Sequence, residues 1–279
     1  RNYQIDGFNW LFRLAHWGVG ACLADDMGLG KTIQALALIL TRCQLGPTLI
    51  VAPTSVCINW LEETKRFAPT LNAAFFGEFI AKDRQKQIEN LSSFGMLICS
   101  YGLMQQEFEM LSQVQWKIIV LDEAQAIKNP STKRSHAAMK LKGDFKLITT
   151  GTPIENHLGE LWNLFRFLNP GLLGSLEWFN QNFALPIEKE GNENAQSRLK
   201  RLIKPFILRR IKSEILEELP PKTEITLHVN MSYEEIAFYE AVRQKAEKKL
   251  SGLTAKAGRE NFQILAEIMR LRRACCRLS

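Results

Sequence analysis

Short apolar runs alternate with longer amphipathic stretches along the first two-thirds of the chain. Runs such as residues 48–52 and 118–121 are wholly or almost wholly apolar, which is typical of strands buried on both faces of a parallel sheet. The stretches between such runs repeat apolar residues every three or four positions, which predicts helices. The pattern predicts strands at 21–25, 47–53, 95–101, 117–124 and 145–153, and helices at 31–43 and 57–67. We therefore expect an α/β fold with a mostly parallel sheet covered by helices.

The pattern changes after residue 153. Residues 160–183 are rich in aromatic residues and are expected to be helical. We expect a polar, exposed loop at 188–197, a basic and mostly helical segment at 198–219 with a break near Pro205, one strand at 222–232, and helices at 233–250 and 260–276. The chain therefore continues into a second, mostly helical part.

The composition is that of an ordinary globular protein. The 279 residues are 46% hydrophobic and 23% charged. No apolar run approaches the roughly 18 residues that span a membrane, so no membrane segment is expected. The six cysteines show neither a Cys-x-x-Cys pair nor the spacing of a zinc site, which favours reduced, buried thiols.

The positive charge is unevenly distributed. The net charge is +7, and residues 198–279 hold 18 Lys and Arg against 10 Asp and Glu. A basic region joined to a nearly neutral one indicates either a polyanionic partner or a solvated helical surface, and charge alone does not choose between them.

Residues 23–32, "LADDMGLGKT", contain most of a phosphate-binding loop. The common pattern is Gly, four residues, and then Gly-Lys-Ser/Thr, but Asp25 stands where the first glycine belongs. We expect Asp25 to lie on the outer shoulder of the loop. Gly28 and Gly30 allow the backbone to approach phosphate closely, while Lys31 and Thr32 supply an ammonium for phosphate and a hydroxyl for magnesium. The loop predicts a nucleotide site.

Two acidic residues follow the apolar run at 118–121. Asp122 can hold the water shell of magnesium, and Glu123 can orient an attacking water. Such a pair alone is often a solvated strand end or a helix cap. In a chain that also carries Gly-Lys-Thr, the pair favours binding of ATP or GTP with Mg²⁺.

The order of the motifs resembles that of the Swi/Snf-type ATPases of helicase superfamily two, which are DNA translocases and remodelers. The resemblance rests on the strings "NYQIDGFNWL", "DDMGLGKT", "IVAPTSVCINW", "ICSYGLM", "DEAQAIKNP", "TTGTPIENHLGELWNLFRFL" and "PFILRRIKSEILEELPPKTE". It implies a RecA-like P-loop fold. An aspartate at position 25 is usual in that family, whereas Asp26 stands where glutamate is more frequent.

The resemblance implies a nucleotide site and a division of the chain. Gln4 matches the adenine-reading glutamine, which implies ATP rather than GTP; on its own it would read as an exposed polar residue. The implied nucleotide-binding residues are Gln4, Asp26, Met27, Gly28, Leu29, Gly30, Lys31 and Thr32, with Thr32 and Asp122 for the metal and Lys31, Asp122 and Glu123 for catalysis. The implied regions are a RecA-like ATP-binding lobe at 1–168, a helical insertion, a brace segment and the lobe's last strand at 169–232, and a helical protrusion at 233–279.

Further roles follow from the same resemblance. The residues expected to couple nucleotide to DNA movement are Gln125, Thr150 and Thr152, and those expected to contact DNA are Ser55, Asn59, Ser100, Lys128 and Asn129. Ordinary strand-end hydroxyls and loop caps remain the alternative for several of these. Trp60 is expected to pack in the core. In the brace segment, Arg209 and Arg210 are expected to pair with acidic residues rather than approach DNA.

The resemblance implies an ATP-dependent duplex-DNA translocase or remodeler, with a protein on the DNA as a further candidate substrate. The chain does not begin with methionine, and it ends at Ser279, where a second RecA-like lobe is expected to begin. We therefore expect a fragment that binds ATP weakly, hydrolyses it slowly and does not translocate alone. The alternatives are an RNA or single-strand helicase, which Gln125 and "IKNP" oppose, and a non-enzymatic ATP- or DNA-binding fragment. A cytoplasmic, nucleoid-associated location in a prokaryote is favoured over a eukaryotic nucleus.

Overall fold

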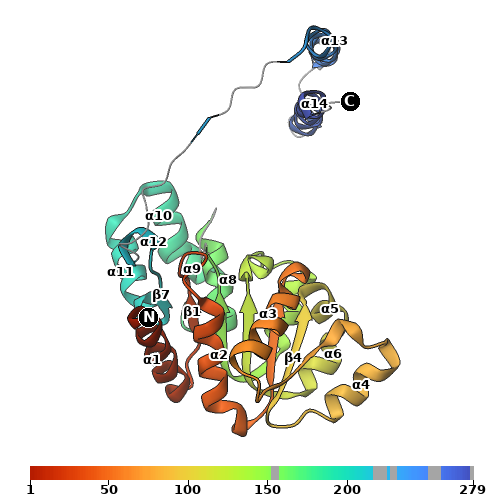
Figure 1. The fold of residues 1–279 in the computed structure, drawn as a ribbon. Coiled ribbons are helices and arrows are strands. Elements are labelled where there is room, and N and C mark those ends of the chain that lie inside the picture. Colours follow the sequence, from red (N-terminus) through yellow and green to blue (C-terminus); the bar gives the residue numbers. More distant parts are fainter. Residues whose placement is uncertain (152–156, 216–224, 227–230, 251–258, 277–279) are drawn as a thin grey trace. The chain divides into compact units, whose positions relative to one another are not determined.

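The computed structural model describes residues 1–151, 157–215, 225–226, 231–250 and 259–276, except the side chains of 259–262 and 276. The chain forms two compact units, Arg1–Leu219 and Pro220–Ser279 (Figure 1). We describe each unit by itself.

A seven-stranded sheet organises the first unit, in the order β3-β4-β2-β5-β6-β1-β7 (Figure 1). The strands are β1 (Ala21–Leu23), β2 (Thr48–Ala52), β3 (Asn72–Phe75), β4 (Gly95–Ser100), β5 (Gln115–Asp122), β6 (Lys142–Thr149) and β7 (Ile207–Leu208). Every neighbouring pair is parallel. The segments that follow the strands therefore gather at one edge of the sheet, where ligands of such sheets bind.

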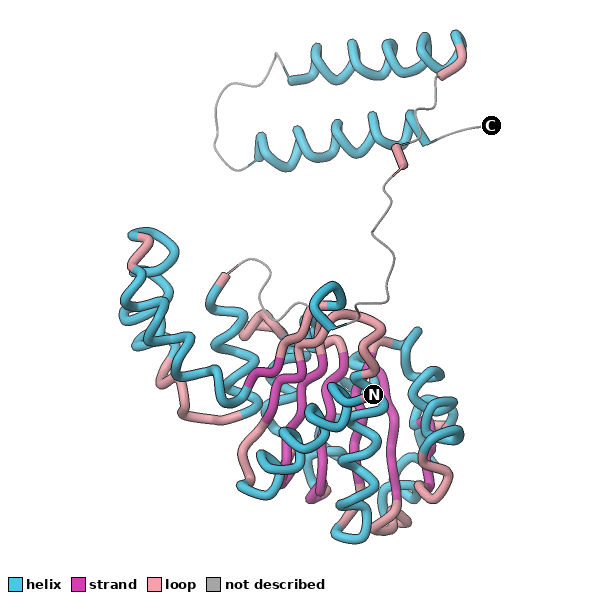
Figure 2. Tube along the Cα trace, turned by 60° about the vertical axis from the view of Figure 1, so that its left-hand side comes forward, coloured by secondary structure: helices cyan, strands magenta, loops and turns pink. Residues whose placement is uncertain are grey.

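Helices lie on both sides of the sheet (Figure 2). The helices of this unit are α1 (Asn2–Trp17), α2 (Lys31–Arg42), α3 (Thr54–Phe67), α4 (Ala81–Glu89), α5 (Tyr101–Gln106), α6 (Phe108–Gln113), α7 (Lys133–Lys140), α8 (Leu158–Leu168), α9 (Leu176–Phe179), α10 (Leu185–Glu190), α11 (Glu193–Ile203) and α12 (Lys212–Ile215). Shorter helical turns are η1 (Cys43–Leu45), η2 (Phe76–Glu78), η3 (Ala124–Ile127), η4 (Asn180–Ala184) and η5 (Lys204–Phe206). All five strands expected from the apolar runs are present, with β3 and β7 in addition.

Alternate side chains of each strand enter different cores. In β5, Ile118 and Val120 pack with α1, α2 and α3, whereas Ile119 and Leu121 pack with α5, α6, α7 and α8. Both faces of the sheet are thus buried, which explains why its strands read as continuous apolar runs. Burying each such side chain contributes about 1.5–3 kcal/mol, so the two cores hold the strand ends firmly in register.

A third cluster lies among helices α8 to α11. Helix α8 contributes to two cores: Leu164 and Phe167 face the sheet, and Leu161 and Phe165 face Phe179 in the third cluster. The aromatic-rich segment at 160–183 therefore packs as a helical layer attached to the sheet through α8.

The basic segment at 198–219 differs from the expectation of mostly helical structure. Helix α11 ends at Ile203, and β7 then pairs with β1, with Ile207 opposite Cys22 and Leu208 opposite Leu23. Pro205 cannot continue a helical hydrogen-bond pattern, and a strand of two residues carries no readable periodicity. The helical prediction was wrong at β7. Most of the strand expected at 222–232 lies outside the described residues.

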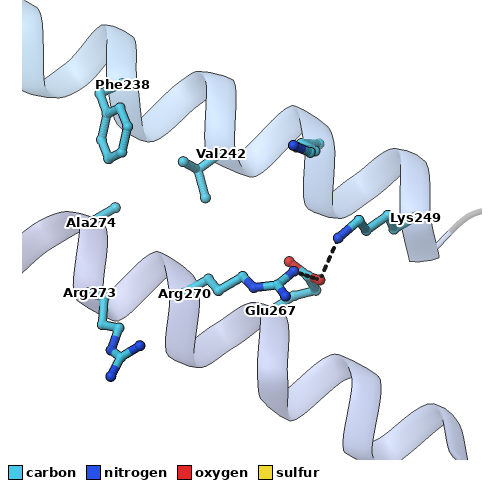
Figure 3. Close-up of a pocket in the computed structure, with 8 residues that line it drawn as sticks. Phe238, Val242, Lys249, Glu267, Arg270, Arg273 and Ala274 are labelled. Atoms are coloured by element: carbon cyan, nitrogen blue, oxygen red, sulfur yellow. Dashed lines mark hydrogen bonds and ion pairs between the residues drawn. The ribbon is translucent and has the colours of Figure 1, made fainter.

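The second unit is described as two packed helices, α13 (Tyr233–Leu250) and α14 (Arg259–Cys276). A pocket of about 800 Å³ lies between them (Figure 3). It is lined by Phe238, Val242, Lys245, Lys249, Glu267, Arg270, Arg273 and Ala274. The carboxylate of Glu267 is shared by Lys249 and Arg270, at 3.4 and 2.5 Å. None of the residues predicted for the nucleotide site lines this pocket.

Across the described ranges, no helix combines the length and apolar character needed to cross a membrane.

Candidate nucleotide site

The loop between β1 and α2 carries the expected phosphate-binding residues. Gly28 and Gly30 have φ angles of +83° and +77°, a left-handed backbone that favours glycine. A Cβ added to Gly30 would lie 2.4 Å from Nε2 of Gln4, so no larger residue fits there without displacing Gln4. Lys31 begins α2, where helix N–H groups favour an anion, and its ammonium donates to the carbonyl oxygen of Asp25 at 2.7 Å. The loop has the form of a phosphate cradle, with Gln4 against it.

The other loop residues point in different directions. The side chain of Leu29 is fully buried, so only its backbone is free to face a ligand, whereas Met27 is 70% exposed. The carboxylate of Asp26 accepts the backbone N–H of Lys212 at 3.1 Å, and the N–H of Asp26 donates to the carbonyl oxygen of Arg210 at 3.0 Å. Asp26 therefore faces the segment after β7 through both its backbone and its side chain.

Asp25 lies inside the protein rather than on the outer shoulder of the loop. Its side chain is fully buried, and the Arg210 guanidinium donates to both carboxylate oxygens, with Nε 3.0 Å from Oδ1. The aspartate that replaces the first glycine of the common pattern is thus an internal ion-pair partner. The expectation that Arg210 pairs with an acidic residue is confirmed, while Arg209 is exposed.

Three donors fix the carboxylate of Asp122 at the end of β5. Its Oδ2 accepts the indole N–H of Trp60 at 2.8 Å. Its Oδ1 accepts the Thr149 hydroxyl at 2.5 Å and the N–H of Glu123 at 3.1 Å. The Tyr101 hydroxyl donates to the backbone carbonyl of Asp122 at 2.8 Å. The orientation of this acid is therefore set by β6, α3 and α5 together.

Glu63 of α3 joins the phosphate loop to Asp122. Burial raises the pKa of the Glu63 carboxyl, and the nearby Asp122 carboxylate raises it further, whereas a hydrogen bond with the Thr32 side chain opposes the shift. The strand pairing places the loop and the acid at one edge: Leu23, which ends β1, and Asp122, which ends β5, are both in register with Thr149 of β6. The two expected metal ligands therefore lie on segments that meet at the same edge of the sheet.

The donor set suits magnesium. Mg²⁺ prefers oxygen ligands, keeps several waters and is usually held by one or two carboxylates together with substrate phosphates. In the part of the chain that the structure describes, no group of three or more His, Cys, Asp or Glu side chains forms a metal site on its own. Thr32 and Asp122, with Glu63 beside them, fit an ion that binds together with a nucleotide.

Glu123 is linked to the end of β6 through Gln125. Glu123 adopts a left-handed backbone with φ of +49°, which is uncommon for a residue other than glycine and is often found at functional sites. The Gln125 amide donates to Glu123 Oε2 at 3.0 Å, and the Thr150 hydroxyl donates to Gln125 Oε1 at 3.3 Å. The structure therefore connects Gln125 and Thr150, two of the residues expected to couple nucleotide to DNA movement, to Glu123. Thr152 lies outside the described residues.

The residues expected to contact DNA occupy the same edge of the sheet. Ser55 and Asn59 are exposed on α3, which follows β2. Ser100 ends the adjacent strand β4, and its hydroxyl accepts the N–H of Leu103 as a helix cap. Lys128 forms an ion pair with Glu160 at 3.3 Å, and the side chain of Asn129 accepts from Ser131 in a turn. Their contacts with DNA stay predictions, and Ser100, Lys128 and Asn129 also have local structural partners.

Sequence reasoning missed the roles of Trp60, Glu63 and Thr149 at this site. Trp60 is in the core as expected, with 1% exposure, but its N–H also orients Asp122. Thr149 directly precedes Thr150, which was expected to take part in coupling. It ends β6, the strand between β5 and β1. The paired acid motif signalled Asp122, but no local pattern signalled the donors that hold it.

Together the parallel sheet, the glycine-rich cradle and the strand-end acids define a P-loop ATPase lobe of the RecA-like kind. More narrowly, the chain belongs to the SNF2-related family, because the SNF2-related domain matches residues 3–279.

Known relatives and solved structures agree with this assignment. The chain is 43% identical to the Bacillus subtilis protein YwqA, named as an ATP-dependent helicase/translocase, over 99% of this chain and 30% of that protein. It is 36% identical to the Arabidopsis thaliana ISWI chromatin-remodeling complex ATPase CHR11, over 99% of this chain and 26% of that protein. The Sulfolobus solfataricus SWI2/SNF2 ATPase core in complex with dsDNA matches with a TM-score of 0.71 and 40% identity, over 98% of this chain and 57% of that chain. The chain thus spans less than a third of the length of YwqA and of CHR11.

Proposed function

We propose that this chain is the ATP-binding lobe of an ATP-dependent translocase that moves on duplex DNA. The observation that carries the proposal is the meeting of two motifs at one sheet edge. The phosphate loop follows β1 and the acids end β5, and Leu23 and Asp122 are both in register with Thr149 of the intervening strand β6. Family membership supports an ATP-dependent, helicase-like function, and the relatives named above are helicases, translocases or remodeling ATPases.

The geometry supports a role for each group. Backbone N–H groups of the loop and the Lys31 ammonium bind phosphate oxygens, and Gln4 reads adenine. Thr32 and Asp122 hold Mg²⁺, which neutralises charge on the phosphates when it is bound. Glu123, positioned by Gln125, orients the attacking water. The arginine finger that accelerates phosphoryl transfer in related hydrolases is expected from a second lobe, so hydrolysis by this chain alone should be slow.

Duplex DNA is the proposed track. Ser55 and Asn59 are exposed on α3, which follows β2, and Ser100 ends the adjacent strand β4. Their hydroxyl and amide groups, with nearby backbone N–H groups, suit phosphates of one DNA strand without reading bases. The charge does not choose between a polyanionic partner and a solvated surface; the support for DNA comes from the solved relative from Sulfolobus solfataricus, which is a complex with dsDNA. A prokaryotic nucleoid is the proposed location, with proteins bound to the DNA as further partners.

A melting experiment tests the nucleotide site. At a hundredfold excess of ligand over its Kd, binding stabilises a protein by about 2.7 kcal/mol. Mg²⁺–ATP should therefore raise the melting temperature of the wild type, and Lys31→Ala should abolish that shift. Lys65→Ala, which removes an exposed lysine of α3, should keep it. An unchanged shift in Lys31→Ala would show that the loop assignment is wrong.

A second experiment distinguishes a duplex-DNA translocase from an unwinding helicase and from a non-enzymatic binding protein. In the complete protein, duplex DNA should stimulate ATP hydrolysis more than RNA or single-stranded DNA of equal length at the same salt concentration. Stronger stimulation by RNA or single strands would favour an unwinding helicase. ATP binding without hydrolysis under any nucleic acid would favour a non-enzymatic binding protein.

A further inference from the structure

Arg210 of the brace segment makes an unusual number of contacts behind the phosphate loop. Its guanidinium donates to both oxygens of Asp25, to the backbone carbonyl of Tyr3, and to Oε1 of Gln34 at 2.8 Å. Its charged group also lies 5.3 Å from the centre of the Tyr3 ring. These partners belong to α1, the phosphate loop and α2, so one side chain connects three separate segments to the chain just after β7.

The surrounding structure is shaped to admit this side chain. A Cβ added to Gly7 of α1 would lie 1.8 Å from Oε1 of Gln34 and 2.8 Å from Nη2 of Arg210, so α1 approaches only because Gly7 lacks a side chain. The side chain of Arg210 is 11% exposed, and that of Asp25 is fully buried. Only a planar fork of donors reaches all four acceptor atoms at once, and a lysine ammonium cannot reproduce it.

Arg210 contacts the residue next to Gln4 in the sequence. Tyr3, whose carbonyl Arg210 holds, is joined to Gln4 by a peptide bond. The Gln4 amide lies over the loop, 3.4 Å from the carbonyl oxygen of Leu29. The other end of the same network holds Asp25 at the start of the loop. Arg210 therefore contacts both the residue next to Gln4 and the acid at the start of the phosphate loop.

We propose that Arg210 is a positioning residue that fixes Gln4 relative to the phosphate loop and thereby sets the preference for ATP over GTP. This inference rests on the nucleotide site proposed above. Adenine offers an amino donor and a ring acceptor to one carboxamide, whereas guanine offers an oxygen in place of the amino group. A carboxamide held in one place distinguishes the two bases, and a displaced one does not.

The test compares the affinities of the protein for Mg²⁺–ATP and Mg²⁺–GTP, measured by calorimetry at low temperature. Wild type should bind ATP more tightly than GTP. Arg210→Lys should weaken ATP binding by about tenfold, the lower end of the loss expected when a supporting contact behind a binding group is removed, and should lower the ratio of the two affinities. Arg209→Lys, at the exposed neighbouring position, should match the wild type.

The ratio of the ATP and GTP affinities distinguishes a change in the position of Gln4 from a loss of folded protein. Partial unfolding reduces both apparent affinities by the same factor, so it leaves their ratio unchanged. The double variant Asp25→Asn/Arg210→Met removes both buried charges, and it should remain folded yet still show the lowered ratio. If wild type binds neither nucleotide, the proposed function fails and this inference fails with it. If wild type prefers ATP and both Arg210 variants keep its full ratio, or if wild type shows no preference, the assignment of Arg210 is overturned while the nucleotide site stands.

Discussion

Asp25 and Asp122 lie at the same edge of the sheet, but their partners differ. One follows β1 and the other ends β5, and they are 0% and 8% exposed. Asp25 is bound by a cation, the guanidinium of Arg210. Asp122 is bound by neutral donors: the Trp60 indole, the Thr149 hydroxyl and the N–H of Glu123.

The difference separates a structural acid from the acid that we propose as a metal ligand. An arginine cancels the charge of a buried carboxylate and leaves little attraction for another cation. Neutral donors orient a carboxylate without cancelling its charge, so Asp122 remains available to a metal ion. The chemistry of the partners, rather than position after a strand or degree of burial, distinguishes the two aspartates.

Removing the structural acid should have the largest effect. Asp25→Ala leaves Arg210 buried without its counter-ion, and breaking a buried pair in this way costs about 3–5 kcal/mol of unfolding free energy. Urea denaturation of the ligand-free protein measures the loss. Asp26→Ala is the matched control, because its carboxylate accepts a single hydrogen bond from Lys212, and its loss should cost about 1 kcal/mol. Equal losses in the two variants would contradict the structural role of Asp25.

Most of the sheet could be predicted from the sequence because its strands are buried on both faces. That burial produces apolar runs, and the runs located β1, β2, β4, β5 and β6 to within a few residues. β7 gave no such signal, since a strand of two residues contains no repeat. The apolar pattern predicted a mostly parallel sheet but not the order of its strands.

The candidate site also has a part that the sequence predicted and a part that it did not. Gly28, Gly30, Lys31 and the acids lie in short motifs, whose chemistry depends on neighbours in sequence. Trp60 and Asp122 are 62 residues apart, and Arg210 and Asp25 are 185 residues apart. Contacts of that kind are created by packing, so no local pattern encodes them. The sequence therefore located the acids but could not tell which one a cation would neutralise.

Removing one neutral donor should have an intermediate effect on the acid proposed as a metal ligand. Trp60→Phe keeps an aromatic ring but loses the N–H that orients Asp122. The Mg²⁺ concentration needed for half-maximal ATP binding should rise about tenfold, as for other contacts that orient a metal ligand. A titration of ATP binding against Mg²⁺ measures it.

Trp116→Phe is the control for Trp60→Phe. Trp116 is also fully buried, and its indole N–H donates to the carbonyl oxygen of Leu111 at 2.9 Å, away from the acids. Both variants should lose about 0.5–1.5 kcal/mol of stability from the missing hydrogen bond. Only Trp60→Phe should change the Mg²⁺ requirement, and an equal change in Trp116→Phe would indicate general loosening of the core instead.

The smallest effect is expected at Glu63, which lies between the phosphate loop and Asp122. Burial, and then the charge of Asp122, raise its pKa above the ordinary value of 4.5, so the folded protein holds this proton more tightly than the unfolded chain. Its contribution to stability is therefore present below that ordinary value and is lost as pH rises through the raised pKa.

Glu63→Gln removes this loss, so the variant should gain stability relative to wild type as pH rises across that window. Urea denaturation at a series of pH values measures the difference, with the exposed neighbour changed in Glu62→Gln as the control. Parallel pH profiles for wild type and Glu63→Gln would contradict a raised pKa of Glu63 in the folded protein.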